Sequence, residues 1–121
     1  MITGLKFASI PTRDQQTALE FWTQKIGFRL ATDQPMGPDQ RWIELLIPGA
    51  DTRIVLFTPP GHEDRIGTFF NGSFVCDNID YTYEKLKAAG VEFEGPPQKQ
   101  PWGTFAKFRD PDGNSFVLSS R

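Results

Sequence analysis

The chain of 121 residues lacks the features of a membrane, secreted or nucleic-acid-binding protein. It has no run of about 18 apolar residues, which a transmembrane helix requires. Its first ten residues lack the apolar core and cleavage site of a signal peptide. Thirteen basic and fifteen acidic residues give a net charge of −2, so no strong positive field attracts nucleic acid. We therefore expect a cytoplasmic protein that binds neither membrane nor nucleic acid.

Cysteine and histidine are equally scarce. The one cysteine, Cys76, cannot form an internal disulfide, which suits a reducing cytosol. Cys76 shares the alternating face of Phe74 on a predicted strand, so we interpret its thiol as a buried structural group. The one histidine, His62, lies in a polar segment and is interpreted as a surface residue. These residues offer few ligands for a transition metal.

Aromatic residues are abundant, at 13% of the chain with eleven phenylalanines and three tryptophans. Their periodicity and the turn residues between them predict alternating strands and helices. The first half is predicted as strand 4–10, helix 14–26, strand 28–31, loop 33–40 and strands 41–47 and 53–58. The second half is predicted as strand 69–75, helix 78–89, strand 91–93, Pro-rich loop 95–101 and strands 104–108 and 115–119. The sequence thus predicts one domain over 1–121, with βαβββ modules at 1–60 and 67–121 and a linker at 59–66.

The two halves also match residue by residue when shifted by about 63 positions. The matched pairs used below are Phe7 with Asn71, Trp42 with Phe105, Glu44 with Lys107, and Val55 with Val117. Sequence identity between the halves is low, so the repeat depends mainly on the order of elements and on turn chemistry.

Three segments carry a resemblance to a known family. They are 14–28 (DQQTALEFWTQKIGF), 78–93 (NIDYTYEKLKAAGVEF) and the last hairpin 108–118 (FRDPDGNSFVL). In order and spacing they resemble the vicinal oxygen chelate superfamily of glyoxalase, bleomycin-resistance and extradiol-dioxygenase proteins over effectively the whole chain. The resemblance implies an α+β fold in which tandem βαβββ modules form a curled mixed sheet around a cleft. It also implies, by analogy, a homodimer.

Members of this superfamily hold a divalent metal with His or Glu side chains from four strands. Carried over by position, those four places fall at Phe7, Val55, Asn71 and Val117. A catalytic metal requires at least three nitrogen, sulfur or carboxylate ligands, and here three side chains are hydrocarbon and one is an amide. The resemblance therefore predicts the fold, whereas the residues predict that no metal and no cofactor is bound.

Strand alternation predicts which side chains face the cleft. If Ile43 and Leu45 pack under the first helix, Trp42 and Glu44 face the cleft, and the repeat adds Phe105 and Lys107. Trp102, at the mouth of a loop, is a candidate lid. The predicted ligand-binding residues are Phe7, Trp42, Glu44, Val55, Phe57, Asn71, Trp102, Phe105, Lys107 and Val117.

The leading hypothesis is therefore binding of a small aromatic or amphipathic molecule, as in sequestration of a toxin or antibiotic. Glu44 would then serve as counter-charge for a cationic ligand, and Arg41 as a clamp for an anionic one. The alternative is a metal-dependent lyase, isomerase or dioxygenase that uses other ligands, such as Glu44 with a residue of a partner chain. A third reading makes the rings core or dimer contacts, Glu44 and Lys107 a solvated pair, and Arg41 an exposed solubilising residue. Catalytic residues are not predicted.

Overall fold

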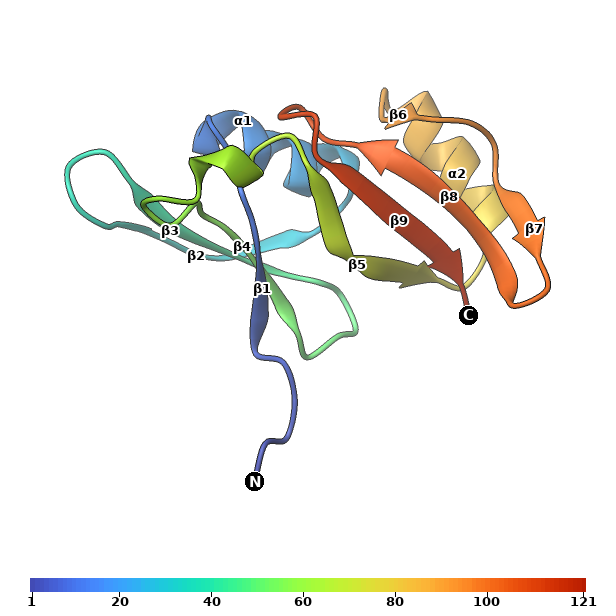
Figure 1. Ribbon diagram of the computed structural model, residues 1–121, viewed down its shortest axis with the longest axis horizontal. Coiled ribbons are helices and arrows are strands. Elements are labelled where there is room, and N and C mark those ends of the chain that lie inside the picture. Colours follow the sequence, from blue (N-terminus) through green and yellow to red (C-terminus); the bar gives the residue numbers. More distant parts are fainter. The chain divides into compact units, whose positions relative to one another are not determined.

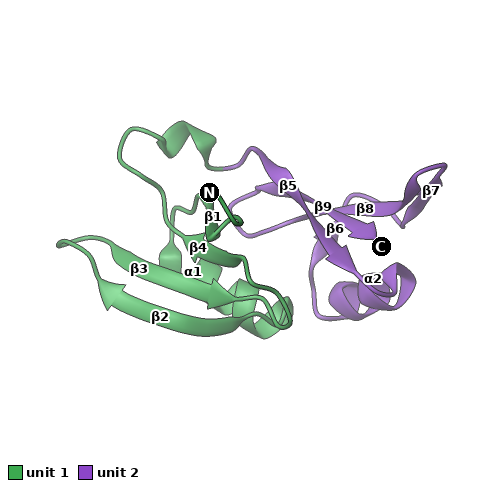
Figure 2. Ribbon diagram, turned by 90° about the horizontal axis from the view of Figure 1, so that it is seen from below, with its two compact units in different colours: residues 1–66 green, residues 67–121 purple.

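The structure, a computed structural model, describes residues 1–121 and divides into two compact units (Figure 1, Figure 2). Unit 1 is Met1–Ile66 and unit 2 is Gly67–Arg121. Each unit contains one mixed sheet and one α-helix that packs against that sheet. None of the helices has the length and apolar character needed to cross a membrane.

Unit 1 has a four-stranded sheet in the order β1-β4-β3-β2. Its strands are β1 (Phe7–Ile10), β2 (Arg29–Pro35), β3 (Arg41–Leu46) and β4 (Arg53–Leu56). Between β1 and β2 lie α1 (Gln15–Glu20) and a π-helical turn, η1 (Phe21–Lys25), and a 3-10 turn, η2 (Glu63–Arg65), follows β4. β1 and β4 are parallel, whereas β4–β3 and β3–β2 are antiparallel.

Unit 2 repeats this topology in the order β5-β9-β8-β6. Its elements are β5 (Phe69–Cys76), α2 (Ile79–Ala88), β6 (Glu92–Phe93), β7 (Gln98–Gln100), β8 (Gly103–Arg109) and β9 (Ser115–Ser120). β5 and β9 are parallel, β8 is antiparallel to β9 and β6, and β7 pairs with the end of β8. The α+β fold of tandem βαβββ modules is confirmed.

The strand registers confirm most of the internal repeat. In unit 1 Val55 pairs with Glu44, and in unit 2 Val117 pairs with Lys107, as the matched positions require. The match of Phe7 with Asn71 is less regular, because the register of β5 against β9 shifts between residues 69 and 73. The pairing of β3 with β4 is therefore repeated by that of β8 with β9, whereas the irregular register of β5 interrupts the repeat at Asn71.

Both helices begin at residues that cap them. The Asp14 carboxylate accepts hydrogen bonds from the backbone N–H groups of Gln16 (3.0 Å) and Thr17 (3.2 Å), and the bond from Thr17 lowers the pKa of Asp14. The Asn78 side chain accepts a bond from the N–H of Tyr81 at 3.1 Å. A side-chain cap contributes about 1 kcal/mol, so these polar residues fix where each helix begins.

The expected boundaries differ from the observed ones in three places. The predicted helix 14–26 consists of α1 followed by the π-helical turn η1, in which the N–H of Ile26 bonds to the carbonyl of Phe21. The predicted loop 33–40 begins as strand, because β2 continues to Pro35. The predicted loop 95–101 contains β7, a short strand paired with the start of β8.

Each sheet packs its helix-facing side chains into its own core. In unit 1 Trp22 has no exposed surface, and its ring centroid lies 5.2 Å from that of Phe21. Ile43 and Leu45 are also fully buried, as the alternation of β3 predicts. In unit 2 the ring of Phe108 stacks on that of Phe116 at 5.2 Å. The opposite faces of the two sheets are thereby left for other contacts.

A buried polar turn joins β8 to β9. Asp110 and Asn114 are 6% and 1% exposed, and the Asp110 carboxylate accepts bonds from the Asn114 N–H (2.9 Å), the Asn114 Nδ2 (2.9 Å) and the Asp112 N–H (3.1 Å). Asn114 Oδ1 also accepts a bond from the N–H of Gly67 at 2.6 Å. The turn of the last hairpin is therefore held by side-chain hydrogen bonds and also holds the start of unit 2.

The burial of Asp110 predicts a pH-dependent stability. Burial raises the pKa of this carboxyl from its ordinary 3.8 to about 6, against the opposing effect of the bonds from Asn114. Because the folded protein then binds the proton more tightly than the unfolded chain, this stabilisation is complete below the ordinary pKa and is lost as the pH rises through about 6. We expect the free energy of unfolding to fall by up to about 3 kcal/mol from this group over that range. Urea unfolding at a series of pH values measures it.

The matched control is Asp110→Asn, which cannot ionise. The unfolding free energy of the native protein minus that of this variant should fall by up to about 3 kcal/mol as the pH rises from about 4 to 7, because only the native protein carries the titrating carboxyl. A difference that is constant across this range would show that Asp110 has the same pKa in the folded and unfolded states.

Candidate functional site

Three aromatic rings meet on the helix-free face of the sheet in unit 1. They belong to Phe7 in β1, Trp42 in β3 and Phe57, which follows β4. The centroids of Phe7 and Trp42 lie 5.5 Å apart in an edge-on arrangement, and those of Trp42 and Phe57 lie 5.7 Å apart. All three rings are partly exposed. The structure brings these predicted site residues together, and their role toward a ligand stays a prediction.

The carboxylate of Glu44 is already paired within unit 1. It accepts a hydrogen bond from the indole N–H of Trp42 at 3.2 Å and forms a 2.6 Å ion pair with Arg53. The hydrogen bond from Arg53 is the main reason that the pKa of Glu44 is lowered. The expectation of an available counter-charge at Glu44 is therefore corrected, because Arg53 already neutralises it.

Two further expectations in unit 1 change with the structure. Val55 has no exposed surface, so it offers nothing to a ligand in this chain. Arg41 holds Asp33 bidentately, with Nε–Oδ1 at 3.1 Å and Nη2–Oδ2 at 2.6 Å, and this guanidinium lowers the pKa of Asp33. The guanidinium fork that was considered as an anion clamp is occupied by a residue of the neighbouring strand.

The helix-free face of unit 2 presents a mixed polar and aromatic surface. Phe105 and Lys107 alternate along β8, and their partners across β9 are Ser119 and Val117. Ser73 of β5 lies beside Val117, and its hydroxyl is 2.7 Å from that of Ser119. Asn71 is exposed at the bulge of β5. Unit 2 thus gathers the predicted residues Asn71, Phe105, Lys107 and Val117 on one sheet.

Trp102 extends this surface beyond the end of β8. It lies in the turn that precedes Gly103, and its ring stacks on that of Phe105 with centroids 5.5 Å apart and planes 24° apart. Trp102 is nevertheless 69% exposed. A large apolar ring that is stacked on one side and open on the other can bind a second flat ring.

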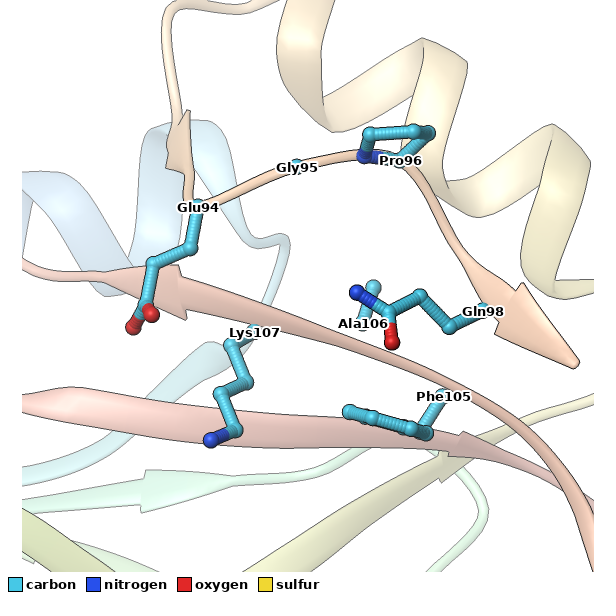
Figure 3. A pocket seen from close by; sticks show the side chains of 7 residues that line it. All are labelled: Glu94, Gly95, Pro96, Gln98, Phe105, Ala106 and Lys107. Atoms are coloured by element: carbon cyan, nitrogen blue, oxygen red, sulfur yellow. The ribbon is translucent and has the colours of Figure 1, made fainter. Parts of the chain in front are cut away.

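A pocket of about 210 Å³ adjoins this stack in unit 2 (Figure 3). Among its lining residues are Glu94, Pro96, Gln98, Phe105, Ala106 and Lys107. Figure 3 shows the Phe105 ring and the Lys107 ammonium on the same side of β8, while Gln98 points from β7 toward that strand. The pocket therefore combines one aromatic wall with one cation, one carboxylate and a neutral amide.

Sequence reasoning missed Glu94 and Gln98 as pocket residues. Gln98 belongs to the segment 95–101, which is predicted as a Pro-rich loop and contains β7, and Glu94 lies between that loop and the predicted strand 91–93. A three-residue polar strand between prolines has no hydrophobic alternation to reveal it. The pairing of Gln98 with Phe105 in register is the structural fact that places it at the pocket.

The side chains at the inherited metal positions do not fit a divalent metal. Phe7, Val55 and Val117 carry only hydrocarbon side chains, and Asn71 offers one neutral amide oxygen. No group of three or more His, Cys, Asp or Glu side chains in residues 1–121 is placed to share an ion. We derive no chemical step through a metal from this donor set.

The remaining reactive side chains are one thiol and one imidazole. Cys76 is partly buried, with Sγ 3.7 Å from the carbonyl of Ser119, and burial raises the pKa of its thiol. A raised thiol pKa disfavours the nucleophilic thiolate, which supports the structural interpretation. His62 is exposed, as predicted.

Known proteins resemble the chain across its whole length. A family model described as the Glyoxalase/Bleomycin resistance protein/Dioxygenase superfamily matches residues 4–118. The protein YetH of Bacillus subtilis (strain 168) is 43% identical over 121 residues, which cover 98% of each chain.

Solved structures agree with these sequence matches. A crystal structure of a member of the same superfamily from Sphaerobacter thermophilus DSM 20745 has a TM-score of 0.89 and 34% identity, covering 99% of this chain and 98% of that one. The crystal structure of TnmS3, an antibiotic binding protein from Streptomyces sp. CB03234, has a TM-score of 0.81 and 34% identity, covering 98% of this chain and 96% of that one. The chain therefore belongs to the Glyoxalase/Bleomycin resistance protein/Dioxygenase superfamily.

Proposed function

We propose that this protein binds a small aromatic or amphipathic molecule without a metal ion, and that it sequesters a toxin or antibiotic. The observation that carries the proposal is the pocket beside the stacked rings of Phe105 and Trp102, one of which is 69% exposed. A preformed aromatic surface beside a hollow binds a flat ring at little ordering cost. The likeness to TnmS3, an antibiotic binding protein, supports this function.

The proposed contacts form two groups, one in each unit. In unit 2 the ligand stacks on Phe105 and Trp102 and reaches Lys107, with Asn71 and Val117 on the same sheet. In unit 1 the rings of Phe7, Trp42 and Phe57 provide a second aromatic surface. Glu44 positions Trp42 through the indole N–H, and Val55 is not among the proposed contacts.

A titration of tryptophan fluorescence tests the binding function. Trp102 is the most exposed of the three tryptophans and Trp22 the most buried, so a stacked ligand should quench part of the emission and leave a constant remainder. We expect saturable quenching with at least one compound of a panel of planar polycyclic antibiotics and naphthalene derivatives. Unchanged emission across the whole panel would contradict the function. Metal analysis of protein purified without chelator is the parallel measurement, and a stoichiometric divalent ion would favour a metal-dependent lyase, isomerase or dioxygenase.

We further propose a cytoplasmic homodimer. The single cysteine supports a reducing location. The exposed apolar side chains of Phe69 and Val75 on β5, an edge strand of unit 2, support association, because unpaired strand edges with apolar side chains favour contact with another chain. Light scattering should give about twice the chain mass of 13.7 kDa. A mass near that of one chain at micromolar concentration would reject the dimer.

A further inference from the structure

The pocket in unit 2 contains a lysine with no anionic partner. No carboxylate lies within 4.0 Å of the Lys107 ammonium, although ion pairs form elsewhere in the chain. Lys107 lines the pocket and is exposed, so its charge is available to a bound molecule. We propose that this pocket selects an aromatic carboxylate, whose anionic group pairs with Lys107 while its ring stacks on Phe105. This inference rests on the proposed function and names the class of its ligand.

The one carboxylate beside Lys107 in the pocket has partners of its own. Glu94 Oε2 accepts a hydrogen bond from the Ser115 hydroxyl at 3.2 Å and lies 3.9 Å from Arg109 Nη2. In Figure 3 the Glu94 carboxylate lies to one side of the Lys107 side chain, and no ion pair joins the two groups. Glu94 therefore does not neutralise Lys107, and the nearby guanidinium offsets its repulsion of an anion.

The spacing along β8 suits a ring that carries an acid group. Phe105 and Lys107 are two residues apart on the same face, which places their Cα atoms about 7 Å from each other. The flexible stem of lysine lets the ammonium reach the edge of a ring stacked on Phe105. An aryl carboxylate therefore meets both side chains at once.

Two serine hydroxyls lie near this lysine on the same sheet. Ser119 pairs with Phe105, and Ser73 pairs with Val117, the partner of Lys107. The two hydroxyls are 2.7 Å apart, and only one of them donates in that bond. The Ser73 hydroxyl also donates to the Phe74 carbonyl at 3.3 Å, so both serine hydrogens are used within the sheet and the anionic group of the ligand relies on Lys107.

The two units differ in which charge is left unpaired beside their aromatic rings. In unit 1 Glu44 is neutralised by Arg53, so its aromatic surface offers no open carboxylate for a cation. In unit 2 the open charge beside a ring is the positive one of Lys107. The pocket volume of about 210 Å³ is below the usual range of roughly 300–1,000 Å³ for drug-sized ligands. The pocket therefore suits a small ligand, such as two fused aromatic rings that carry one acid group.

Three naphthalene probes of equal size and different charge test the inference. Ligand-observed NMR titrations with 2-naphthoate, 2-naphthylmethanol and 2-naphthylmethylammonium give the affinity of each. We expect 2-naphthoate to bind about tenfold more tightly than the alcohol, the gain of a charge-assisted contact. Lys107→Met should abolish this preference and leave the affinity for the alcohol within about twofold, because the stem is retained.

The control variant is Lys25→Met, which removes another exposed lysine from the last turn of η1 in unit 1 and should keep the preference. A second measurement uses the unaltered protein: raising the salt concentration should weaken the binding of 2-naphthoate and leave that of the alcohol unchanged. Equal affinities for the acid and the alcohol, or tightest binding of the ammonium probe, would overturn the inference while the binding function stands. If none of the three probes binds, both the preference for a carboxylate and the assignment of this pocket as the ligand site are rejected.

Discussion

Replacing Asn114 with alanine is expected to lower the free energy of unfolding by about 2–4 kcal/mol. The side chain is 1% exposed; it accepts a bond from the Gly67 N–H at 2.6 Å and donates one to the Asp110 carboxylate at 2.9 Å. Alanine would leave the Gly67 N–H and a buried carboxyl oxygen of Asp110 without these partners. Such groups cost about 1–3 kcal/mol each when they are stranded, and more when charged. Urea unfolding followed by circular dichroism measures the change.

The matched control is Asn71→Ala, in the same unit. Asn71 is exposed on β5, so its loss should change the free energy of unfolding by less than about 0.5 kcal/mol. If Asn114→Ala were as mild as this control, the turn between β8 and β9 would not depend on its buried polar bonds. The effect of Asn114→Ala should also be pH-dependent, because its Nδ2 opposes the rise in the pKa of Asp110 that burial causes.

The fold could be predicted where local chemistry decides the structure. Asp14 and Asn78 cap the two helices with their own side chains, and Gly27 and Gly90 end them in the left-handed region at φ 97° and 96°. These residues carry the same meaning in any chain, so the sequence alone locates the helices. Alternating burial along β3 likewise depends only on strand geometry.

The fold could not be predicted where a strand forms by backbone pairing with its neighbour and has no hydrophobic alternation in its sequence. β2 ends in the polar residues Thr32–Pro35 at the edge of its sheet, and β7 is the polar segment Gln98–Gln100. Both segments are exposed over nearly their whole length, so no buried face imposes alternation and both have the composition of loops. The π-helical turn η1 is hidden for a related reason, since one added residue leaves the apolar face almost unchanged.

The candidate site shows the same division. The grouping of Phe7 with Trp42 follows from strand alternation and was predicted. The ion pair of Glu44 with Arg53 depends on the register of β3 against β4, which composition does not reveal. Charge complementarity at a site therefore has to be taken from the structure, which pairs both Glu44 and Arg41 within unit 1.

Replacing Phe105 with alanine is expected to weaken the binding of an aromatic ligand about 10- to 100-fold, since a stacked ring contributes about 1–3 kcal/mol. Phe105 lines the pocket and carries Trp102 on its face, so the variant removes one ring and releases the other. The emission of Trp102 should change even without ligand, which separates loss of the stack from loss of the fold. Affinity is measured by the same fluorescence titration, with far-ultraviolet circular dichroism to verify folding.

Two further variants decide how the Phe105→Ala result is interpreted. Phe105→Tyr keeps the ring and should retain affinity within about threefold, because stacking depends on the aromatic face. Tyr81→Ala removes an exposed ring from α2, on the helix side of the sheet, and should leave binding unchanged. If Phe105→Ala bound the ligand within twofold of the native protein, the binding surface would lie elsewhere, and the rings of Phe7, Trp42 and Phe57 in unit 1 would become the site to test. The stacked pair in unit 2 is the stronger candidate because it adjoins both a pocket and an open charge.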